Sequence, residues 1–275
     1  MNEKILLFIP AYNCQKQLPR VLEKIHLASL PSSITEILII DNCSVDNTIQ
    51  EGIEASKKLN IPTTILRNNE NYSLGGSIKR AFLYAIEQKY DYLIVLHGDD
   101  QADIHDILGP LEKKLHLQND LLIGARFHAE SQIKGYSWER RLGNIIMNKV
   151  FSWVVDSQVD DMIAGINCFN ISFFKSMFFL PFPNNLTFDA HVLLYAFDAN
   201  ARISYFPITW REEDQISNAK VVKQAFIILR LLVKYLFLKK RTFTENNSGY
   251  SLDFNYPSQL ILSDSVAKVP KDVNE

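Results

Sequence analysis

Acidic side chains follow two of the most apolar runs of the sequence, in positions that suit a nucleotide and a metal ion. Asp41 ends the run Ile37–Ile40, where its carboxylate can accept hydrogen bonds from a base N–H or a ribose hydroxyl. Asp99 and Asp100 follow the run Tyr92–Leu96. Two adjacent carboxylates repel each other, and a hard cation such as Mg²⁺ or Mn²⁺ would offset the repulsion. The alternative at both places is a structural turn, closed by an Asx contact or leading into a helix N-cap.

A glycine pair precedes a segment with helical spacing. Gly75 and Gly76 come before Ser77–Gln88, and glycine lets a ligand approach the backbone closely at a helix N-terminus that favours anions. The pair alone is weak evidence. The sequence has neither a Gly-x-x-x-x-Gly-Lys-Ser/Thr loop nor a Gly-x-Gly-x-x-Gly turn after its first apolar run. A P-loop NTPase and a common dinucleotide dehydrogenase are therefore disfavoured.

Two histidines near the acidic pair suggest a different chemistry. His97, Asp99 and His105 together offer ligands for a hydrolytic metal centre. His105 lies inside the segment after the loop, where its side chain can face away from the other two. A metal hydrolase is therefore the less favoured alternative.

The polar residues come at the ends of short apolar runs, and this indicates the fold that positions them. The runs are unbroken rather than alternating, which suits strands buried on both faces of a parallel sheet, and helix-like segments separate them. We therefore expect an α/β fold with right-handed βαβ units. The loops at the carboxyl ends of parallel strands share one edge, where ligands bind. The runs are Ile5–Ile9, Ile37–Ile40, Thr63–Leu66, Tyr92–Leu96, Leu121–Ile123 and Ile203–Phe206.

Size and composition are those of a globular protein. The 275 residues suggest one or two domains at about 150 residues each. A net charge of −2 gives no reason to expect a nucleic-acid partner. Cys14, Cys43 and Cys168 do not make a disulfide framework, and we find neither a secretory signal nor a bilayer-spanning stretch. We expect a cytoplasmic protein, either soluble or peripheral on the inner face of the cell membrane.

Six segments carry a resemblance to a known family, in the order of that family's motifs. They are Ile9–Asn13 (similar to Pro-x-Tyr-Asn-Glu), Asp41–Thr48 (Asp-Asp-x-Ser-x-Asp-x-Thr), Asn71–Gly76 (Asn-x-Gly-x-Gly-Gly), His97–Gln101 (Asp-x-Asp-x-Gln), Gly124–Arg126 (Gly-Ser-Arg) and Asp161–Asn167 (Asp-x-x-Ser-Gly). Over residues 4–220 the chain thus resembles family 2 glycosyltransferases of the GT-A fold, particularly the dolichyl- and polyprenyl-phosphate sugar transferases.

The resemblance implies a fold, a reaction and a set of site residues. The fold would be GT-A, a Rossmann-like, mostly parallel sheet flanked by helices, and the enzyme an inverting, metal-dependent transferase. Asp41 would contact the base, while Asp99, with Asp100 as a further ligand, would hold Mn²⁺ or Mg²⁺ at the diphosphate. The implied nucleotide-sugar-binding residues are Pro10, Ala11, Tyr12, Asn13, Asp41, Ser44, Asn71, Gly76, Gly98, Asp99, Gln101 and Arg126.

The sequence departs from the family pattern at three positions. Cys14 stands where glutamate is usual, Ser73 replaces a glycine, and His97 replaces the first aspartate of the metal motif. A neutral histidine lacks the charge to support an ion in the same way, so either Asp100 compensates or the affinity for metal is lowered. These departures motivate a second hypothesis, a nucleotide-sugar-binding protein that has lost catalysis.

Three residues are candidates for the transfer step itself. Arg211 and Lys220 lie where the family has Arg-x-x-Gly-x-Ser-Lys, and they would stabilise the departing diphosphate. Asp189 lies where many relatives carry an acidic residue near the acceptor, as a general base or an orienting group. The alternatives are a solvated loop with a salt-bridged Arg211, and N-capping of a helix by Asp189.

We divide the chain into a catalytic domain over 1–218, a basic amphipathic helix over 219–241 and a loosely ordered tail over 242–275. The helix carries four cations within an arc of roughly 80° beside a wide apolar face. This suits a helix at an anionic membrane surface, and packing on the domain is the alternative. The cations are Lys220, Lys223, Arg230 and Lys234.

The expected activity is transfer of a sugar from a UDP- or GDP-linked donor. The acceptor would be a polyprenyl phosphate, or a lipid-linked or cell-surface glycan under construction, as in cell-wall or surface-polysaccharide synthesis. A hydroxyl acceptor needs a general base, whereas a lipid phosphate is already anionic.

Overall fold

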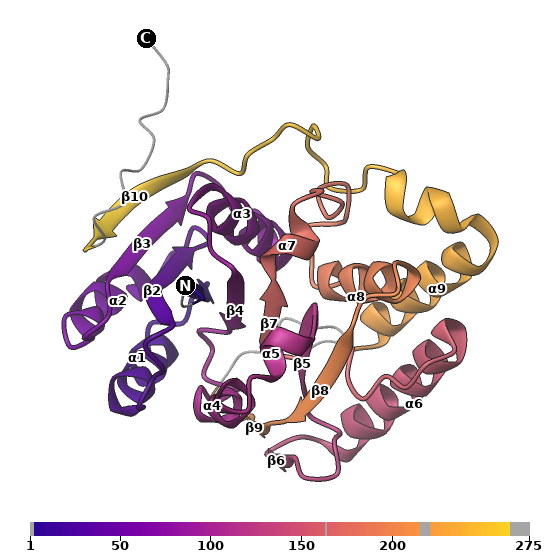
Figure 1. Cartoon of the computed structure of the whole chain (residues 1–275), viewed down its shortest axis with the longest axis horizontal. Coiled ribbons are helices and arrows are strands. Elements are labelled where there is room, and N and C mark those ends of the chain that lie inside the picture. The colour runs from indigo at the N-terminus through magenta and orange to yellow at the C-terminus, as the bar shows by residue number, and fades with distance from the viewer. Residues whose placement is uncertain (1–2, 163, 215–220, 265–275) are drawn as a thin grey trace.

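The apolar runs form an eight-stranded sheet in the computed structural model, which describes residues 3–162, 164–214 and 221–264 (Figure 1). The strand order is β10-β3-β2-β1-β4-β7-β5-β8. The strands are β1 (Ile5–Ala11), β2 (Ile34–Asp41), β3 (Thr63–Asn68), β4 (Tyr92–Leu96), β5 (Leu121–Ala125), β7 (Ile166–Asn170), β8 (Ile203–Pro207) and β10 (Ser258–Ser263).

Most neighbouring strands run parallel. β1 pairs in parallel with β2 and β4, β2 with β3, and β5 with β8. β7 runs antiparallel between β4 and β5, and β10 runs antiparallel beside β3. Two short strands, β6 (Gln132–Lys134) and β9 (Thr209–Arg211), pair separately. The prediction of a mostly parallel sheet is confirmed, and it follows from unbroken apolar runs that need cover on both faces.

Helices cover both faces of this sheet (Figure 1). One face packs against α1 (Gln17–Leu27), α2 (Thr48–Ser56), α4 (His105–Glu112) and α5 (Leu115–Gln118). The other face packs against α3 (Ser73–Glu87), α6 (Trp138–Val155), α7 (Ile171–Phe174), α8 (Phe188–Asp198) and α9 (Val221–Thr244).

The C-terminal part differs from the loosely ordered tail expected over 242–275. After α9 the chain crosses back over the molecule, and β10 extends the sheet beside β3 (Figure 1). Tyr256 is buried on the way, and Tyr72 packs edge-on against three rings of this segment at centroid distances of 5.4 to 5.8 Å. The rings belong to Tyr250, Phe254 and Tyr256. The partners lie far apart in sequence, so local polarity concealed this packing. Residues 265–275 lie outside the described part.

α9 is amphipathic, as predicted, and its inner face packs on the domain. Ile228, Leu231 and Leu232 are buried in the same core as α6 and α8. Of the four cations expected on its basic stripe, Lys234 forms an ion pair with Glu245 at 2.6 Å. Lys220 lies outside the described residues. Among the helices of the described ranges, none is long and apolar enough to cross a bilayer.

Candidate functional site

The loops after β1, β2 and β4 meet at one edge of the sheet, as the sequence predicts. The amide of Asn42 donates to the carbonyl of Ala11 at 2.9 Å, and the amide of Gly98 donates to the carbonyl of Pro10 at 3.1 Å. A Cβ atom on residue 98 would lie 2.9 Å from the Pro10 oxygen, so only glycine permits this approach. The order β2-β1-β4 in the sheet brings these loops together.

Asn13 joins the loops after β1 and β2. Its amide donates to Ser44 Oγ at 2.9 Å, and its side-chain oxygen accepts from the amide of Val45 at 3.0 Å. The side chain of Tyr12 next to it is 43% exposed. The predicted nucleotide-binding residues Tyr12, Asn13 and Ser44 therefore lie in one neighbourhood, with an aromatic ring open to a ligand.

Asp41 closes the turn after β2. Its carboxylate is buried and accepts from the amide of Ser44 at 3.1 and 3.3 Å, while Arg67 Nε lies 3.7 Å away. Burial raises the pKa of Asp41, and the hydrogen bonds from Ser44 oppose the rise. The structural turn considered in the sequence analysis is therefore present. A contact between Asp41 and a nucleotide base stays a prediction.

Asn71 belongs to a network of amides that sequence reasoning missed. Its side-chain oxygen accepts from Asn42 Nδ2 at 2.8 Å and from the amide of Ser73 at 2.9 Å. Asn42 Oδ1 in turn accepts from Asn68 Nδ2 and from the amide of Tyr72, both at 2.9 Å. These bonds fix the loop before α3, and the signal was the recurrence of asparagine after successive strands.

Gly75 and Gly76 have a packing role that the sequence did not suggest. A Cβ atom on Gly75 would lie 2.6 Å from the Cβ atom of Phe188 in α8, and the Gly76 amide donates to the carbonyl of Asn184 at 3.2 Å. The pair thus allows the N-terminal turn of α3 to approach the chain that leads into α8. Contact of Gly76 with a phosphate stays a prediction.

Gly75→Ala is expected to lower the free energy of unfolding by about 2 kcal/mol, because the added methyl group overlaps Phe188 and the backbone of Asn184. Gly143 in α6 is the matched control, since a Cβ atom there meets nothing within 4 Å. Gly143→Ala should instead raise stability by about 0.5–1 kcal/mol. Urea unfolding of the two variants measures both effects, and equal changes in the two would contradict this role.

His97 and Asp99, at the end of β4, provide possible metal ligands. Asp99 Oδ1 accepts from the amide of Gln101 at 3.1 Å. Burial raises the pKa of Asp99 and lowers the pKa of His97, so the imidazole is held neutral. His97 Nε2 is buried and has no hydrogen-bond partner among the described residues. A carboxylate oxygen and a neutral imidazole nitrogen together fit a divalent transition-metal ion such as Mn²⁺.

The hydrolase hypothesis fails because His105 does not join this pair. His105 lies in the first turn of α4, largely exposed, with Nδ1 2.7 Å from Asp103. Within the described ranges, no group of three or more His, Cys, Asp or Glu side chains is arranged to hold an ion. A hydrolytic centre built from His97, Asp99 and His105 is therefore wrong.

Asp100 is held by three cations. Its carboxylate accepts from Arg20 Nε at 2.8 Å, from Lys24 Nζ at 2.7 Å and from an Arg211 guanidinium nitrogen at 2.5 Å. These contacts already neutralise the carboxylate, so binding a metal ion would require it to leave them. Asp100 as a metal ligand stays a prediction, and Asp99 is the less encumbered of the two. Arg20 and Lys24 were missed, although their i,i+4 spacing on α1 was a signal.

Two of the three acids after Arg211 form ion pairs. Glu212 contacts Arg140 at 2.5 Å and Asp214 contacts Arg20 at 2.8 Å. The salt-bridged loop considered as the alternative for this region is therefore present, and the pairs reduce the repulsion that these acids would exert on a phosphate. A role for Arg211 at the diphosphate stays a prediction, and Lys220 lies outside the described residues.

Arg126 links the end of β5 to the segment before β7. Its guanidinium forms two hydrogen bonds with Asp161, at 2.7 and 2.8 Å, and lies 5.0 Å above the ring of Trp210. The carbonyl of Gly165 accepts from the amide of His97 at 2.9 Å. The predicted motifs around Arg126 and Asp161 therefore lie beside the loop of His97.

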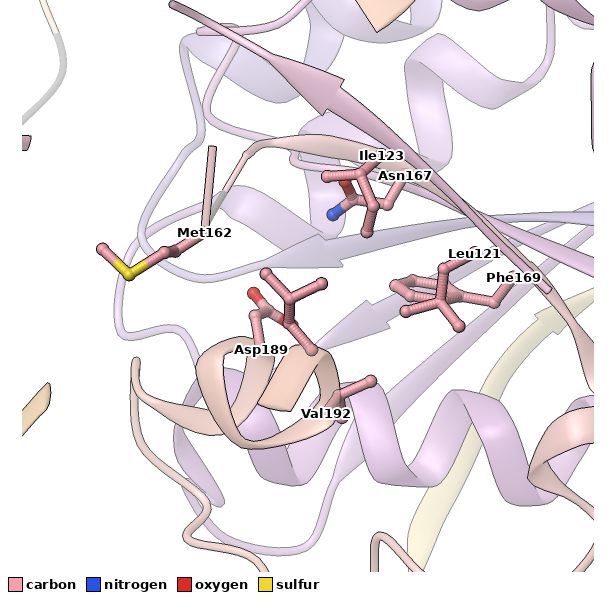
Figure 2. Close-up of a pocket in the computed structure, with 8 residues that line it drawn as sticks. Leu121, Ile123, Met162, Asn167, Phe169, Asp189 and Val192 are labelled. Atoms are coloured by element: carbon pink, nitrogen blue, oxygen red, sulfur yellow. The ribbon is translucent and has the colours of Figure 1, made fainter. Parts of the chain in front are cut away.

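Asp189 points from the first turn of α8 into a small cavity (Figure 2). The cavity volume is about 10 Å³, enough for about one water molecule. The Asp189 carboxylate forms no hydrogen bond or ion pair with the described residues. Burial raises the pKa of Asp189 to about 7. The helix begins after Thr187, so the N-cap role considered as the alternative for Asp189 is absent. The lining residues are Leu121, Ile123, Met162, Asn167, Phe169, Asp189, Val192 and Leu193.

A mostly parallel sheet, flanked by helices, whose strand ends bring carboxylates, amides and an arginine to one edge is the architecture of the GT-A fold, which solved glycosyltransferase structures share. The chain belongs to glycosyl transferase family 2, whose family model matches residues 7–202. It is a glycosyltransferase, and its relatives include the polyprenyl-phosphate sugar transferases.

Two relatives and one solved structure illustrate the similarity. The chain is 22% identical to polyprenol monophosphomannose synthase of Mycolicibacterium smegmatis, over 61% of this chain and 62% of that protein. It is 25% identical to a dolichyl-phosphate beta-glucosyltransferase of Trichomonas vaginalis, over 82% of this chain and 72% of that protein. Glucosyl-3-phosphoglycerate synthase of Mycobacterium tuberculosis, solved with Mn²⁺, UDP and glucosyl-3-phosphoglycerate, shares the fold. Its TM-score is 0.58 at 13% identity, over 94% of this chain and 87% of that one.

Proposed function

We propose that this glycosyltransferase moves a sugar from a UDP- or GDP-linked donor to a polyprenyl phosphate or to a lipid-linked or surface glycan. The transfer proceeds with inversion, by direct displacement of the nucleoside diphosphate. The observation that carries the proposal is the shared edge at which the loops of Tyr12, Asp41 and Asp99 converge. The names of the relatives support a lipid or glycan acceptor, and the UDP-bound neighbour supports a uridine donor.

Asp99 and His97 would hold the divalent ion, Mn²⁺ or Mg²⁺. The fit rests on the neutral imidazole with its unpartnered Nε2 and on the carboxylate two residues further along the chain. Bound there, the ion would offset the negative charge that builds on the leaving diphosphate. Imidazole nitrogen is a ligand for transition-metal ions more than for Mg²⁺, so this pair favours Mn²⁺.

The remaining donor contacts come from the chain itself. The exposed ring of Tyr12 would stack on the nucleotide base, and Asp41 would accept a hydrogen bond from the base or ribose. Arg126 would orient the transferred sugar or the diphosphate, with Asp161 holding its guanidinium in place. Asp41 and Arg126 are held by hydrogen bonds before the donor arrives, so little ordering of these two side chains is needed on binding.

Asp189 would act at the acceptor. A carboxylate that has no partner among the described residues, and whose pKa burial raises to about 7, is matched to accepting a proton near neutral pH. Its cavity lies against Asn167 and Met162, in the segment whose Gly165 contacts His97. With a hydroxyl acceptor, Asp189 would remove the hydroxyl proton during displacement. With a phosphate acceptor it would only orient the substrate.

Calorimetry with a panel of UDP- and GDP-sugars, with and without Mn²⁺, tests the proposal. We expect at least one nucleotide sugar to bind, and to bind more tightly with Mn²⁺ present. Transfer is then assayed with polyprenyl phosphate and with lipid-linked glycans. Donor binding without transfer to any acceptor would instead support the protein that has lost catalysis, which His97 and Cys14 favour. Absence of binding by every nucleotide sugar, with Mn²⁺ supplied, would overturn both.

A further inference from the structure

α6 exposes a stripe of large apolar side chains. Four residues of this helix, separated by four, four and seven positions, are between 50% and 76% exposed. At 100° per residue they fall within an arc of roughly 80°, while the opposite face packs into the core. The stripe consists of Trp138, Leu142, Ile146 and Trp153.

α9 exposes a second apolar stripe. Its inner face is buried beside α6 and α8, but four residues on its outer face are between 38% and 79% exposed. They recur at spacings of three and four residues, as one face of a helix requires. These residues are Phe226, Leu229, Val233 and Phe237. Large apolar side chains on two neighbouring helices make a patch that an ordinary hydrated surface would not carry.

Cations border both stripes. Within residues 221–244 there is no aspartate or glutamate, and the exposed Lys223, Arg230 and Lys240 have no ion pair among the described residues. On α6, the exposed Arg141 and Lys149 are likewise without an acidic partner in the described ranges. Glu139 is the one acidic residue of α6, so the patch is apolar and carries an excess of positive charge.

We propose that the outer faces of α6 and α9, the α6–α9 surface, dock onto an anionic lipid bilayer without crossing it. Both helices pack on the same core cluster and lie side by side, so their outer faces point away from the same body (Figure 1). Tryptophan and leucine can enter the interface while lysine and arginine contact anionic headgroups. A second copy of the chain fits less well, because a two-fold contact would bring the cations of both copies into one interface.

The surface also lies beside the site. α6 begins at Trp138, and Arg140 in its first turn contacts Glu212, the residue after Arg211. A bilayer on the α6–α9 surface would therefore present a membrane-bound acceptor next to the loops that hold the donor. This consequence rests on the proposed function, whereas binding to lipid does not.

The test is co-sedimentation of the full chain with phosphatidylcholine vesicles, prepared with and without phosphatidylglycerol. We expect binding to the anionic vesicles, weakened by salt, and a shift of tryptophan emission to shorter wavelength.

Two double variants remove the apolar side chains of one helix each. We expect a roughly tenfold lower partition coefficient for Trp138→Ser with Trp153→Ser on α6, and likewise for Phe226→Ser with Phe237→Ser on α9. Leu27→Ser is the matched control, because Leu27 is 72% exposed on α1, outside the α6–α9 surface. Arg230→Gln should weaken binding to the anionic vesicles, and Lys58→Gln, at an exposed position outside the α6–α9 surface, is its control.

The outcomes separate this proposal from the others. Failure to bind anionic vesicles, or equal losses in the Leu27→Ser control, would overturn membrane docking. A dimer in size-exclusion chromatography that the α6 and α9 variants abolish, without vesicle binding, would assign the surface to a second copy. Donor binding is measured by calorimetry without vesicles. Absence of donor binding in that experiment would therefore count against the transferase proposal and not against membrane docking.

Discussion

Replacing Asp99 with asparagine is expected to lower the rate of sugar transfer by about a thousandfold while leaving the protein folded. Asparagine has nearly the same shape and can still accept the hydrogen bond from the amide of Gln101. It lacks the charge that would hold a divalent ion, and without the ion the leaving diphosphate loses its main stabilisation. Turnover with a saturating donor and Mn²⁺ affinity, followed by electron paramagnetic resonance, should fall together.

Two further variants give this experiment its controls. Asp156→Asn makes the same change at an exposed position with φ of 51°, which asparagine tolerates, and should leave both readouts unchanged. Asp100→Asn removes the carboxylate that pairs with Arg20, Lys24 and Arg211. We therefore expect it to lower the free energy of unfolding and to change the free energy of Mn²⁺ binding by a smaller amount. If Asp99→Asn keeps full metal affinity and turnover, Asp99 is not a metal ligand.

The sheet was predictable because its signal is local. A run such as Ile5–Ile9 needs cover on both faces whatever follows it, and this requirement alone predicts β1. Once the parallel order is accepted, the loops with Asp41 and Asp99 must share an edge. The C-terminal packing was not predictable in this way. Its partners, such as Tyr72 for Tyr256, are distant in sequence, and short aromatic segments resemble polar tails when read alone.

Partnerships between charged groups were the least predictable part of the site. Asp100 is adjacent to Asp99, but Arg20 and Lys24 reach it from α1, about eighty positions earlier in the chain. Lys79 in α3 was equally hard to predict, but its hydrogen-bond partners are uncharged and burial lowers its pKa to about 7. It is fully buried, and its ammonium donates to the carbonyl of Leu180 at 2.9 Å and to the hydroxyl of Tyr256 at 3.2 Å. Residue type indicates a group that can carry charge, and only the fold shows whether an opposite charge or uncharged oxygen atoms surround it.

Asp189→Asn is expected to lower the rate of transfer to a hydroxyl acceptor by about a thousandfold, because the amide cannot take up the acceptor's proton. In the wild-type protein the rate should rise with pH through about 7, as the carboxyl group ionises. With a phosphate acceptor the loss should be small and the pH dependence weak. Transfer rates measured across pH with both acceptor types therefore distinguish the two roles.

The same variant should be more stable than the wild type at alkaline pH. Burial raises the pKa of Asp189 from 3.8 to about 7, so between these values the folded protein keeps a proton that the unfolded chain releases. Stability conferred by the protonated group is complete below pH 4 and is lost as the pH rises through 7. Asparagine is uncharged throughout and avoids this loss. The Tm of Asp189→Asn should exceed that of the wild type at pH 8 and match it near pH 4.

A gain in stability together with a loss of activity would identify Asp189 as a group retained for its chemistry, since a half-buried carboxylate without a partner among the described residues has no structural advantage. Asp156→Asn again provides the control, with neither quantity changed. Lower stability of Asp189→Asn at pH 8 would mean that the carboxylate has a structural partner. Full transfer to a hydroxyl acceptor by the variant would place the general base elsewhere. The stability readout does not depend on the acceptor, so it tests the environment of Asp189 even before the acceptor is identified.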